Sequence, residues 1–367
     1  MKEKKYTCDI CHEEHDLSEL TYFDESYLCE DCLRRETFIC RDCGDRHWND
    51  DSADGDLCQT CYDEDYVRCE RCDAVIHYDD ACYHEDEEYH DHPYCRDCFD
   101  MDEIIHDYYY KPEPIFYGDG PRYLGVELEL DDGGENEFCA SKLLDIANAQ
   151  KERMYIKHDG SLDDGFECVT HPMTLDYHIN QMPWRSILNK AVAKGYLSHQ
   201  AGTCGLHVHI SRNALGANYE EQEATIAKIL YFYEKFWNEI LTFSRRTESQ
   251  VEHWARRYGG GIINPKETLK HAKNSHMGRY AAVNLENEAT IEMRIFRGTL
   301  KYSTFIATLQ MVDEICKVAI SLSDEFMQGL TWLDFVKGIA DGKQELINYL
   351  KEKRLYVNEP IRNEVEI

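Results

Sequence analysis

The chain has 367 residues, enough for two or three domains, and a formal net charge of −31. It contains no run of eighteen apolar residues, and its N-terminus, MKEKKYTCDI, lacks the apolar segment of a signal peptide, so we expect a soluble cytoplasmic protein rather than a secreted or membrane protein. The excess of acidic residues argues against nucleic-acid binding, because phosphates would be repelled.

Six CxxC pairs occur in the first hundred residues, and none follows them. A chain in a reducing compartment favours zinc thiolates over disulfides, and twelve thiols supply three tetrahedral zinc sites. Pairing within each repeat is the simplest arrangement, and a cross-braced pairing between neighbours stays open. The pairs are Cys8/Cys11, Cys29/Cys32, Cys40/Cys43, Cys58/Cys61, Cys69/Cys72 and Cys95/Cys98.

The pairs belong to an internal repeat, because its first pair recurs at positions 8, 40 and 69. This spacing predicts three zinc-ribbon or treble-clef modules at 1–36, 37–66 and 67–105. Each is too small to bury a core, so metal binding would supply the free energy of folding. Four protein ligands leave no open position for catalysis. The longer third repeat also contains Cys82, His84, His90 and His92, either as surface residues, which we favour, or as a weaker fourth site.

The zinc array holds most of the negative charge. Residues 1–110 contain 34 Asp and Glu against 10 Lys and Arg, a net charge of −24, whereas residues 111–367 contain 37 against 30, a net charge of −7. Such a surface is either simply solvated or a docking surface for a basic partner or cationic substrate. We expect the array to recruit or select a protein or peptide substrate.

Prolines and glycines in residues 106–121 predict a linker, and the next segment, 122–130, reads RYLGVELEL. Its alternation predicts a strand that projects Glu127 and Glu129 from one face, about 7 Å apart. In a core sheet, two bare carboxylates would repel each other by a few kcal/mol. A divalent cation relieves that repulsion, and carboxylate oxygens favour Mg²⁺ or Mn²⁺.

Three later segments also alternate between apolar side chains and side chains able to ligate metal. Each alone is compatible with a satisfied polar residue in a core. Four strands of this kind predict a sheet face lined with metal ligands. The segments are 165–170 with Glu167, 205–211 with His207 and His209, and 290–296 with Glu292 and Arg294.

The remaining segments predict scaffold. Residues 219–241 and 302–322 have the apolar spacing of amphipathic helices, and 323–367 is expected to be a helical extension in which Thr331 and Asp334 form an N-terminal cap pair. The sequence has no GxGxxG motif and no P-loop, so a nucleotide would have to bind through metal ions and arginines.

The order GVELE, HDGSL…GFECVTHP, CGLHVHIS, SRRTESQVEHWARRY and RYAAVNLENEATIEMRIFRGTL resembles the amidoligase family. That family is grouped with glutamine synthetase and glutamate–cysteine ligase as carboxylate–amine ligases. The resemblance covers roughly residues 122–320 and implies an α+β catalytic domain at 122–322, a glutamine synthetase-like antiparallel sheet with helices.

The resemblance also implies ATP as a co-substrate and two sets of magnesium ligands. Glu127-x-Glu129, His207-x-x-x-Ser211 and Glu292-x-Arg294 are similar to motifs of glutamine synthetase. By this similarity, Glu129 and Glu167 hold a metal beside the substrate carboxylate. Glu127, His207 and Glu292 hold the metal that bridges the nucleotide phosphates, and His209 orients groups or faces the substrate.

The chemistry of carboxylate activation points to further residues, because phosphoryl transfer needs cations around the phosphate. We expect Arg279, Arg294 and Arg297, with Ser211, near the nucleotide; Arg245 and Arg246 could form a mobile phosphate or carboxylate clamp. A solvated surface position is the alternative for every arginine except Arg294. Asp159 could bind the amine and accept its proton, or simply form an Asp-Gly turn.

Three other functions are compatible with parts of the sequence. The protein could be a zinc-scaffold adaptor whose ligase-like domain is inactive, or a metal-dependent hydrolase that uses the HxH motif without ATP. A cysteine nucleophile at Cys204 beside His207 is disfavoured, since Cys204 lies at a bend before a strand. The sequence does not identify the amine and carboxylate substrates, and an oligomer is compatible with it.

Overall fold

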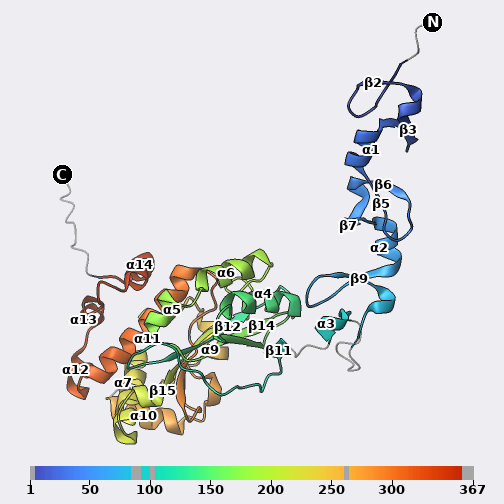
Figure 1. The fold of residues 1–367 in the computed structure, drawn as a ribbon. Coiled ribbons are helices and arrows are strands. Elements are labelled where there is room, and N and C mark those ends of the chain that lie inside the picture. The colour runs from blue at the N-terminus through green and yellow to red at the C-terminus, as the bar shows by residue number, and fades with distance from the viewer. Residues whose placement is uncertain (1–4, 84–91, 100–103, 260–263, 358–367) are drawn as a thin grey trace, which may run out of the picture. The chain divides into compact units, whose positions relative to one another are not determined.

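The structure is a computed structural model, and it describes residues 5–83, 92–99, 104–259 and 264–357. The chain divides into two compact units, Met1–Asp102 and Glu103–Ile367 (Figure 1). Two of the residues considered for a fourth metal site, His84 and His90, lie outside the described residues.

The N-terminal unit consists of three zinc-ribbon-like modules with a common plan. The first CxxC of a module lies in the turn of a short hairpin; the first cysteine of its second CxxC directly precedes a helix and the second lies within that helix. The elements are β1 (Tyr6–Thr7), β2 (Glu14–His15), η1 (Leu17–Glu19), β3 (Leu20–Phe23), β4 (Ser26–Cys29) and α1 (Glu30–Glu36); β5 (Thr37–Ile39), β6 (Arg46–Trp48), η2 (Asn49–Asp51), β7 (Ser52–Asp54), β8 (Leu57–Cys58) and α2 (Gln59–Asp65); and β9 (Tyr66–Arg68), β10 (Val75–His77), η3 (Tyr78–Asp80) and α3 (Arg96–Phe99).

The modules have very small cores. Besides the cysteines, one fully buried apolar side chain anchors each described core: Leu28, Leu57 and Tyr94 in turn. Neighbouring modules also touch, since Trp48 of the second module lies against the ring of Phe23 in the first, with centroids 5.2 Å apart. Cores of this size cannot offset the chain entropy of folding, which agrees with modules built around metal ions.

The C-terminal unit is built on a seven-stranded sheet of order β11-β13-β14-β12-β15-β17-β16. Every neighbouring pair is antiparallel except β11 and β13, which are parallel. The strands are β11 (Ile105–His106), β12 (Leu124–Leu130), β13 (Met154–Lys157), β14 (Phe166–Thr170), β15 (Leu206–Ser211), β16 (Val283–Asn284) and β17 (Thr290–Met293).

One face of this sheet packs on helices and forms the main core. Val126, Leu128 and Val208 are at most 1% exposed and share a cluster with the long helix α11. The expected α+β class is therefore confirmed. The helices are α4 (Glu137–Ala147), α5 (Leu175–Asn180), α6 (Trp184–Ala193), η4 (Arg212–Ala214), α7 (Tyr219–Lys235), α8 (Trp237–Ser244), α9 (Glu248–Trp254), α10 (Pro265–Asn274), η5 (Gly278–Tyr280), α11 (Tyr302–Ser321), α12 (Asp324–Gly329), α13 (Trp332–Lys337) and α14 (Gln344–Glu352).

The single helix predicted over 219–241 is two helices, because α7 ends at Lys235 and α8 begins at Trp237. Phe236 between them has non-helical angles of φ −108° and ψ 35°. The guanidinium of Arg257 binds both the main-chain and the side-chain oxygens of Glu234, which satisfies a carbonyl at the end of α7. This contact comes from a distant segment, so the local apolar pattern could not reveal the break.

Two segments predicted to lie outside the catalytic fold are part of the C-terminal unit. β11, at the start of the predicted linker, pairs with β13 through Ile105 and His106. In the predicted helical extension, α14 buries Leu346 and Leu350 fully in the core that contains α11. The cap pair predicted there is confirmed, since Thr331 and Asp334 form a capping box at α13.

Candidate functional site

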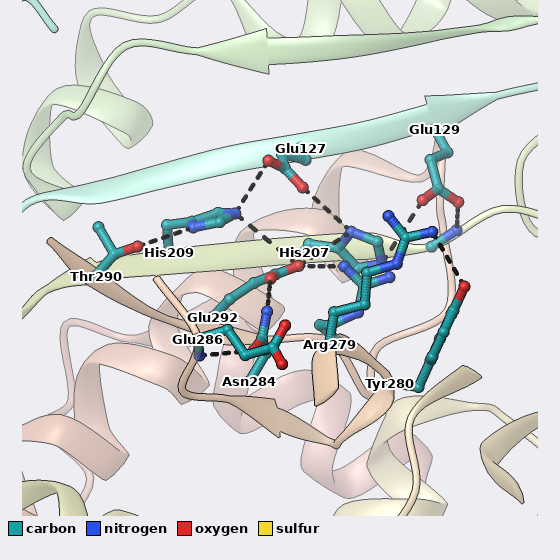
Figure 2. Close-up of polar contacts among 12 residues, drawn as sticks. Glu127, Glu129, His207, His209, Arg279, Tyr280, Asn284, Glu286, Thr290 and Glu292 are labelled. Atoms are coloured by element: carbon teal, nitrogen blue, oxygen red, sulfur yellow. Dashed lines mark hydrogen bonds and ion pairs between the residues drawn. The ribbon is translucent and has the colours of Figure 1, made fainter. Parts of the chain in front are cut away.

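The face of the sheet that is not packed on α11 carries the ligand-type side chains from four adjacent strands, β14, β12, β15 and β17. Cross-strand pairing brings them together: Glu129 lies opposite Glu167, Glu127 opposite His207, and His209 opposite Glu292. Side chains alternate along a strand, so Glu127 and Glu129 point to this face while Val126 and Leu128 point to the core. Four segments far apart in sequence therefore contribute to one site, and Figure 2 shows the members from β12, β15 and β17.

His207 lies at the centre of the acidic side chains. Its Nδ1 is 3.3 Å from Oε2 of Glu127 and 3.6 Å from Oε1 of Glu292, and its Nε2 is 3.6 Å from Oε1 of Glu129. The candidate ligand atoms of Glu127, His207 and Glu292 all lie within 4.8 Å of one another. The three residues expected to share the nucleotide-side metal are thus brought together.

The second predicted pair, Glu129 and Glu167, is deeply buried, at 3% and 2% exposure. Glu129 accepts a hydrogen bond from the backbone N–H of Gly205. Among the described residues no hydrogen bond reaches Oε2 of Glu167, although the ammonium of Lys157 lies 3.1 Å from it. Lys157 lies on β13, opposite Glu167 on β14, and was not among the predicted site residues. The alternation of the segment MYIK could have indicated it.

The electrostatics of these carboxylates fit a cation site. Burial raises the pKa of Glu167 well above its usual range, and the charge of Glu127 adds to that shift. Burial also raises the pKa of Glu129. For Glu127, burial acts in the same direction, but His209 and His207 outweigh it and hold the pKa well below its usual range. A divalent cation would let all these carboxylates ionise together, and oxygen ligands suit Mg²⁺ or Mn²⁺.

His209 stands beside this set rather than at its centre. Its Nε2 is 3.1 Å from Oε1 of Glu127, and its Nδ1 is 3.2 Å from the hydroxyl of Thr290. Burial lowers the pKa of His209, but the contact with Glu127 outweighs it, so the pKa is raised overall. A histidine held at both nitrogens can orient Glu127, which is compatible with the predicted orienting role.

Two of the predicted arginines lie near the carboxylates. Arg294 donates a hydrogen bond of 2.5 Å to Glu292 just beyond the end of β17. Arg246 is 7% exposed, and burial lowers its pKa to about 10, while the charge of Glu129 acts in the opposite direction. Neither residue has a described hydrogen-bond partner at Nε. Both therefore retain a buried donor that an anion could use.

The other three arginines are arranged differently. Arg245 is not a free clamp: it ends α8 with φ +66° and donates to the main-chain carbonyls of Arg297 and Gly298. This anchoring argues against the predicted mobile role for Arg245. Arg297 follows β17 and pairs through its backbone with Gly205. Arg279 is exposed on η5 and donates to the hydroxyls of Tyr108 and Tyr280.

Asp159 forms the turn that the sequence offered as its alternative role. Its carboxylate accepts a 2.7 Å hydrogen bond from the N–H of Ser161, and its charge also acts on Glu129 and Glu167. Ser211 lies half-buried at the end of β15, opposite Thr290. Cys204 is buried and its pKa is raised to about 12, chiefly by that burial, so a reactive thiolate is not supported there.

Part of the chain is similar to a known protein family. Residues 141–316 match the model of a family described as "Putative amidoligase enzyme". The C-terminal unit is amidoligase-like. The matched residues include Glu167, His207 and Glu292, whereas β12 with Glu127 and Glu129 precedes them.

The other comparisons are more distant. No curated protein matches the sequence of this chain. Among solved structures, a bifunctional glutathione synthetase from Pasteurella multocida is similar with a TM-score of 0.33 and 13% sequence identity, over 65% of this chain and 45% of that one. This chain therefore spans less than half the length of that synthetase.

The cysteines outside the amidoligase-like unit form three four-cysteine clusters. The clusters are Cys8, Cys11, Cys29 and Cys32; Cys40, Cys43, Cys58 and Cys61; and Cys69, Cys72, Cys95 and Cys98. In each, the four sulfurs lie within 4.8 Å of one another, and all twelve cysteines are free of disulfides. The sequential pairing within each repeat is the one that the structure has, and the donor sets fit zinc.

Backbone donors favour a thiolate at the first cysteine of the first two clusters, whereas burial raises the pKa of Cys32 and Cys61 in the same clusters. The N–H of Cys29 points to Sγ of Cys8 at 3.3 Å, and the N–H of Cys58 points to Sγ of Cys40 at 3.4 Å. Burial acts against ionisation, but such N–H donors hold the pKa of Cys8 and of Cys40 at about 6. Thiolates at neutral pH are what a zinc ion binds.

Across the part of the chain that the structure describes, no helix is long and apolar enough to cross a membrane.

Proposed function

We propose that the amidoligase-like unit is an ATP-dependent carboxylate–amine ligase that acts through an acyl phosphate. The observation that carries the proposal is the convergence of Glu127, His207 and Glu292, from three adjacent strands, within 4.8 Å on one polar face. The family match over residues 141–316 supports a ligase rather than another metal-dependent reaction.

The carboxylates and His207 would form two cation sites with different roles. Glu127, His207 and Glu292 would hold the cation that contacts the nucleotide phosphates, and Glu129 with Glu167 would hold a cation beside the substrate carboxylate. When bound, Mg²⁺ or Mn²⁺ would neutralise the phosphate charge. Arg294 and Arg246, each with a buried donor atom that has no described hydrogen-bond partner, would bind oxygens of the transferred phosphoryl group.

The chemistry has two steps. An oxygen of the substrate carboxylate attacks the γ-phosphorus of ATP, the bond from that phosphorus to the bridging oxygen breaks, and ADP leaves. The amine nitrogen then attacks the acyl carbon, the bond from that carbon to the phosphate oxygen breaks, and inorganic phosphate leaves. The nitrogen loses a proton as the amide forms, and Asp159, whose charge acts on Glu129 and Glu167, would receive it.

The zinc modules would serve a separate role in the same protein. Their four-cysteine clusters leave no position for a substrate on the metal, so they would act through their surface. The net charge of −24 over residues 1–110 suits the recruitment of a basic protein or peptide.

Trapping with hydroxylamine tests the ligase without knowledge of the natural amine. The full-length protein is incubated with ATP, Mg²⁺, hydroxylamine and a panel of carboxylates, and both hydroxamate and ADP are measured. An ¹⁸O-labelled carboxylate should deliver one ¹⁸O atom to the inorganic phosphate. Glu127→Gln should lower the rate by about 10²-fold or more, the scale expected for losing a group that stabilises transition-state charge.

Glu286→Gln is the matched control, because Glu286 is an exposed acid in the loop between β16 and β17. It should leave hydroxamate formation at the rate of the wild type. Phosphate without ¹⁸O would contradict the acyl phosphate, and metal-dependent hydrolysis that needs no ATP would contradict the ligase.

A further inference from the structure

Lys157 is a cation of the site to which the proposed reaction gives no role. It lies on β13, opposite Glu167, which in turn lies opposite Glu129. Its ammonium is 3.1 Å from Oε2 of Glu167, and its side chain is 16% exposed, so it faces the site and remains accessible from it. Oε2 of Glu167 has no other described polar partner, so the ammonium of Lys157 is its main polar contact.

Tyr108 covers this cation. It follows β11, which lies next to β13 in the sheet, and its ring centroid is 5.6 Å from Nζ of Lys157. Its hydroxyl accepts a hydrogen bond from Nη1 of Arg279, a residue 171 positions later in the chain. A chain of contacts therefore runs from Glu167 through Lys157 and Tyr108 to Arg279.

Arg279 brings a second cation to the same end of the site. It lies on η5, and its other terminal nitrogen donates to the hydroxyl of Tyr280 at 3.0 Å. Figure 2 shows its guanidinium pointing toward Glu129 and His207. Arg294 is bound to the carboxylate of Glu292, whereas the described contacts of Arg279 are with two neutral tyrosines: the hydroxyls of Tyr108 and Tyr280 and the ring of Tyr280. A charged ligand can replace the contacts with the hydroxyls.

These positions matter because the reaction requires a carboxylate to approach two other carboxylates. In the proposed complex the metal ion offsets the charge of Glu129 and Glu167, but the carboxylate oxygens of the substrate still need donors that fix their position. Cations of the protein that face this pair can supply those donors. Lys157 contacts Glu167 directly, and Arg279 is linked to Lys157 through Tyr108.

We propose that Lys157, Tyr108 and Arg279 form the subsite that holds the substrate carboxylate beside Glu129 and Glu167. The two cations bind the carboxylate oxygens, and Tyr108 positions both cations through its ring and its hydroxyl. This inference rests on the proposed ligase function. Tyr108 lies outside residues 141–316, so this part of the subsite comes from the segment that precedes the family match.

The test separates carboxylate binding from the other steps. Hydroxamate formation is measured as the concentrations of glutarate, L-glutamate, ATP and hydroxylamine are varied in turn. Lys157→Met and Arg279→Met should each raise the KM for the carboxylate about 10- to 100-fold, the range for losing a charged hydrogen bond. The KM for ATP and for hydroxylamine should change less than twofold. Tyr108→Phe should give a smaller rise, about two- to tenfold, because the ring remains.

Two further variants serve as controls, Lys157→Arg and Lys142→Met. Lys157→Arg should bind the carboxylate almost as well as the wild type, unlike Lys157→Met, which a purely structural role of Lys157 would not predict. Lys142 pairs with Asp145 on α4, away from this face, and its change should leave every KM as in the wild type. The melting temperature of each variant shows whether it has folded.

Binding measured by calorimetry decides the inference separately from turnover. Glutarate and L-glutamate are titrated into the full-length protein with Mg²⁺ and a non-hydrolysable ATP analogue. Weaker binding to Lys157→Met and Arg279→Met supports the subsite even if no hydroxamate forms, an outcome that would overturn only the ligase chemistry. An unchanged carboxylate KM in folded variants of an active enzyme, or no binding of either probe to the wild type, overturns the subsite.

Discussion

Cross-strand neighbours, not sequence neighbours, define the site at the scale of single residues. His207 meets Glu127 because β15 pairs with β12 in the register that sets these residues opposite each other. A shift of that register by one residue would turn His207 toward the core and bring Leu206 or Val208 to the polar face. Since Leu206 and Val208 are fully buried, the hydrophobic core fixes the register and thereby brings the candidate metal ligands together.

His178 offers a prediction about stability at acidic pH. It is fully buried; its Nε2 pairs with the carbonyl of Leu124 at 3.0 Å and its Nδ1 accepts from Trp184 at 3.2 Å. Burial lowers its pKa to about 4 from 6.5. Between pH 6.5 and pH 4 the unfolded chain therefore binds a proton at His178 that the folded chain excludes. The free energy of unfolding has its full value, as far as His178 determines it, above pH 6.5, and it falls as the pH drops toward 4.

Because of His178, we expect the free energy of unfolding to be about 2 kcal/mol lower at pH 5 than at pH 7. Urea unfolding followed by tryptophan fluorescence measures the difference. His178→Gln should remove that part of the pH dependence, while His253→Gln, at an exposed position on α9, should keep it. An equal pH dependence in the wild type and in His178→Gln would show that His178 is not the group that titrates.

At the scale of single residues, the sequence predicted the candidate metal ligands better than the contacts of the surrounding arginines and tyrosines. The alternation of VELEL and LHVHIS was enough to place Glu127, Glu129 and His207 on one face. It could not reveal that Tyr108 reaches Arg279, since that contact joins segments 171 residues apart. Arg245 also escaped prediction, because its role depends on two carbonyls that only the folded chain brings near it.

At the scale of elements, each zinc module combines a helix with one or two described hairpins around one cluster of thiols. The helix depends on the cluster directly, because α2 begins after Cys58 and places Cys61 in its first turn. With only Leu57 as a fully buried apolar side chain in the second module, little else can keep this helix in place. The module should therefore unfold when its metal ion is lost.

This dependence predicts the zinc content of the protein. The wild type should contain three zinc ions per chain, and Cys61→Ser should contain two, as measured by mass spectrometry of the metal. Cys82→Ser is the matched control from the same unit, since Cys82 lies outside the three clusters, and it should retain three. A loss of zinc from Cys82→Ser would instead support a site that includes Cys82.

The predicted elements failed where distant contacts override local pattern. The stretch 219–241 reads as one amphipathic helix, yet Arg257 and the surrounding core end α7 at Lys235. β11 has only two residues within a segment rich in prolines and tyrosines, so no periodicity could indicate it. By contrast, Thr331 and Asp334 were predictable as a cap, because a capping box is formed by residues three positions apart.

At the scale of the whole molecule, the boundary between the two units decides what can be removed without damage to the site. The N-terminal unit ends at Asp102, and residues 104–110 belong to the amidoligase-like unit through β11 and Tyr108. The charge follows this division, because residues 1–102 contain 32 Asp and Glu against 10 Lys and Arg, a net charge of −22, and residues 103–367 contain 39 against 30, a net charge of −9. A truncation can therefore separate the contribution of the zinc modules from that of the sheet.

Two truncations that differ by eight residues make this separation. Removal of residues 1–102 should leave hydroxamate formation from glutarate within about twofold of the full-length rate, because the sheet and the proposed subsite remain. Removal of residues 1–110 should raise the carboxylate KM by about tenfold or more, since β11 and Tyr108 are lost with the contacts to Lys157 and Arg279.

If the zinc modules select the substrate, the protein that lacks residues 1–102 should also lose the preference for basic peptides over other peptides, because the acidic surface is gone. An unchanged peptide preference would mean that the modules do not choose the substrate, and equal kinetics for the two truncations would mean that residues 103–110 add nothing to the site.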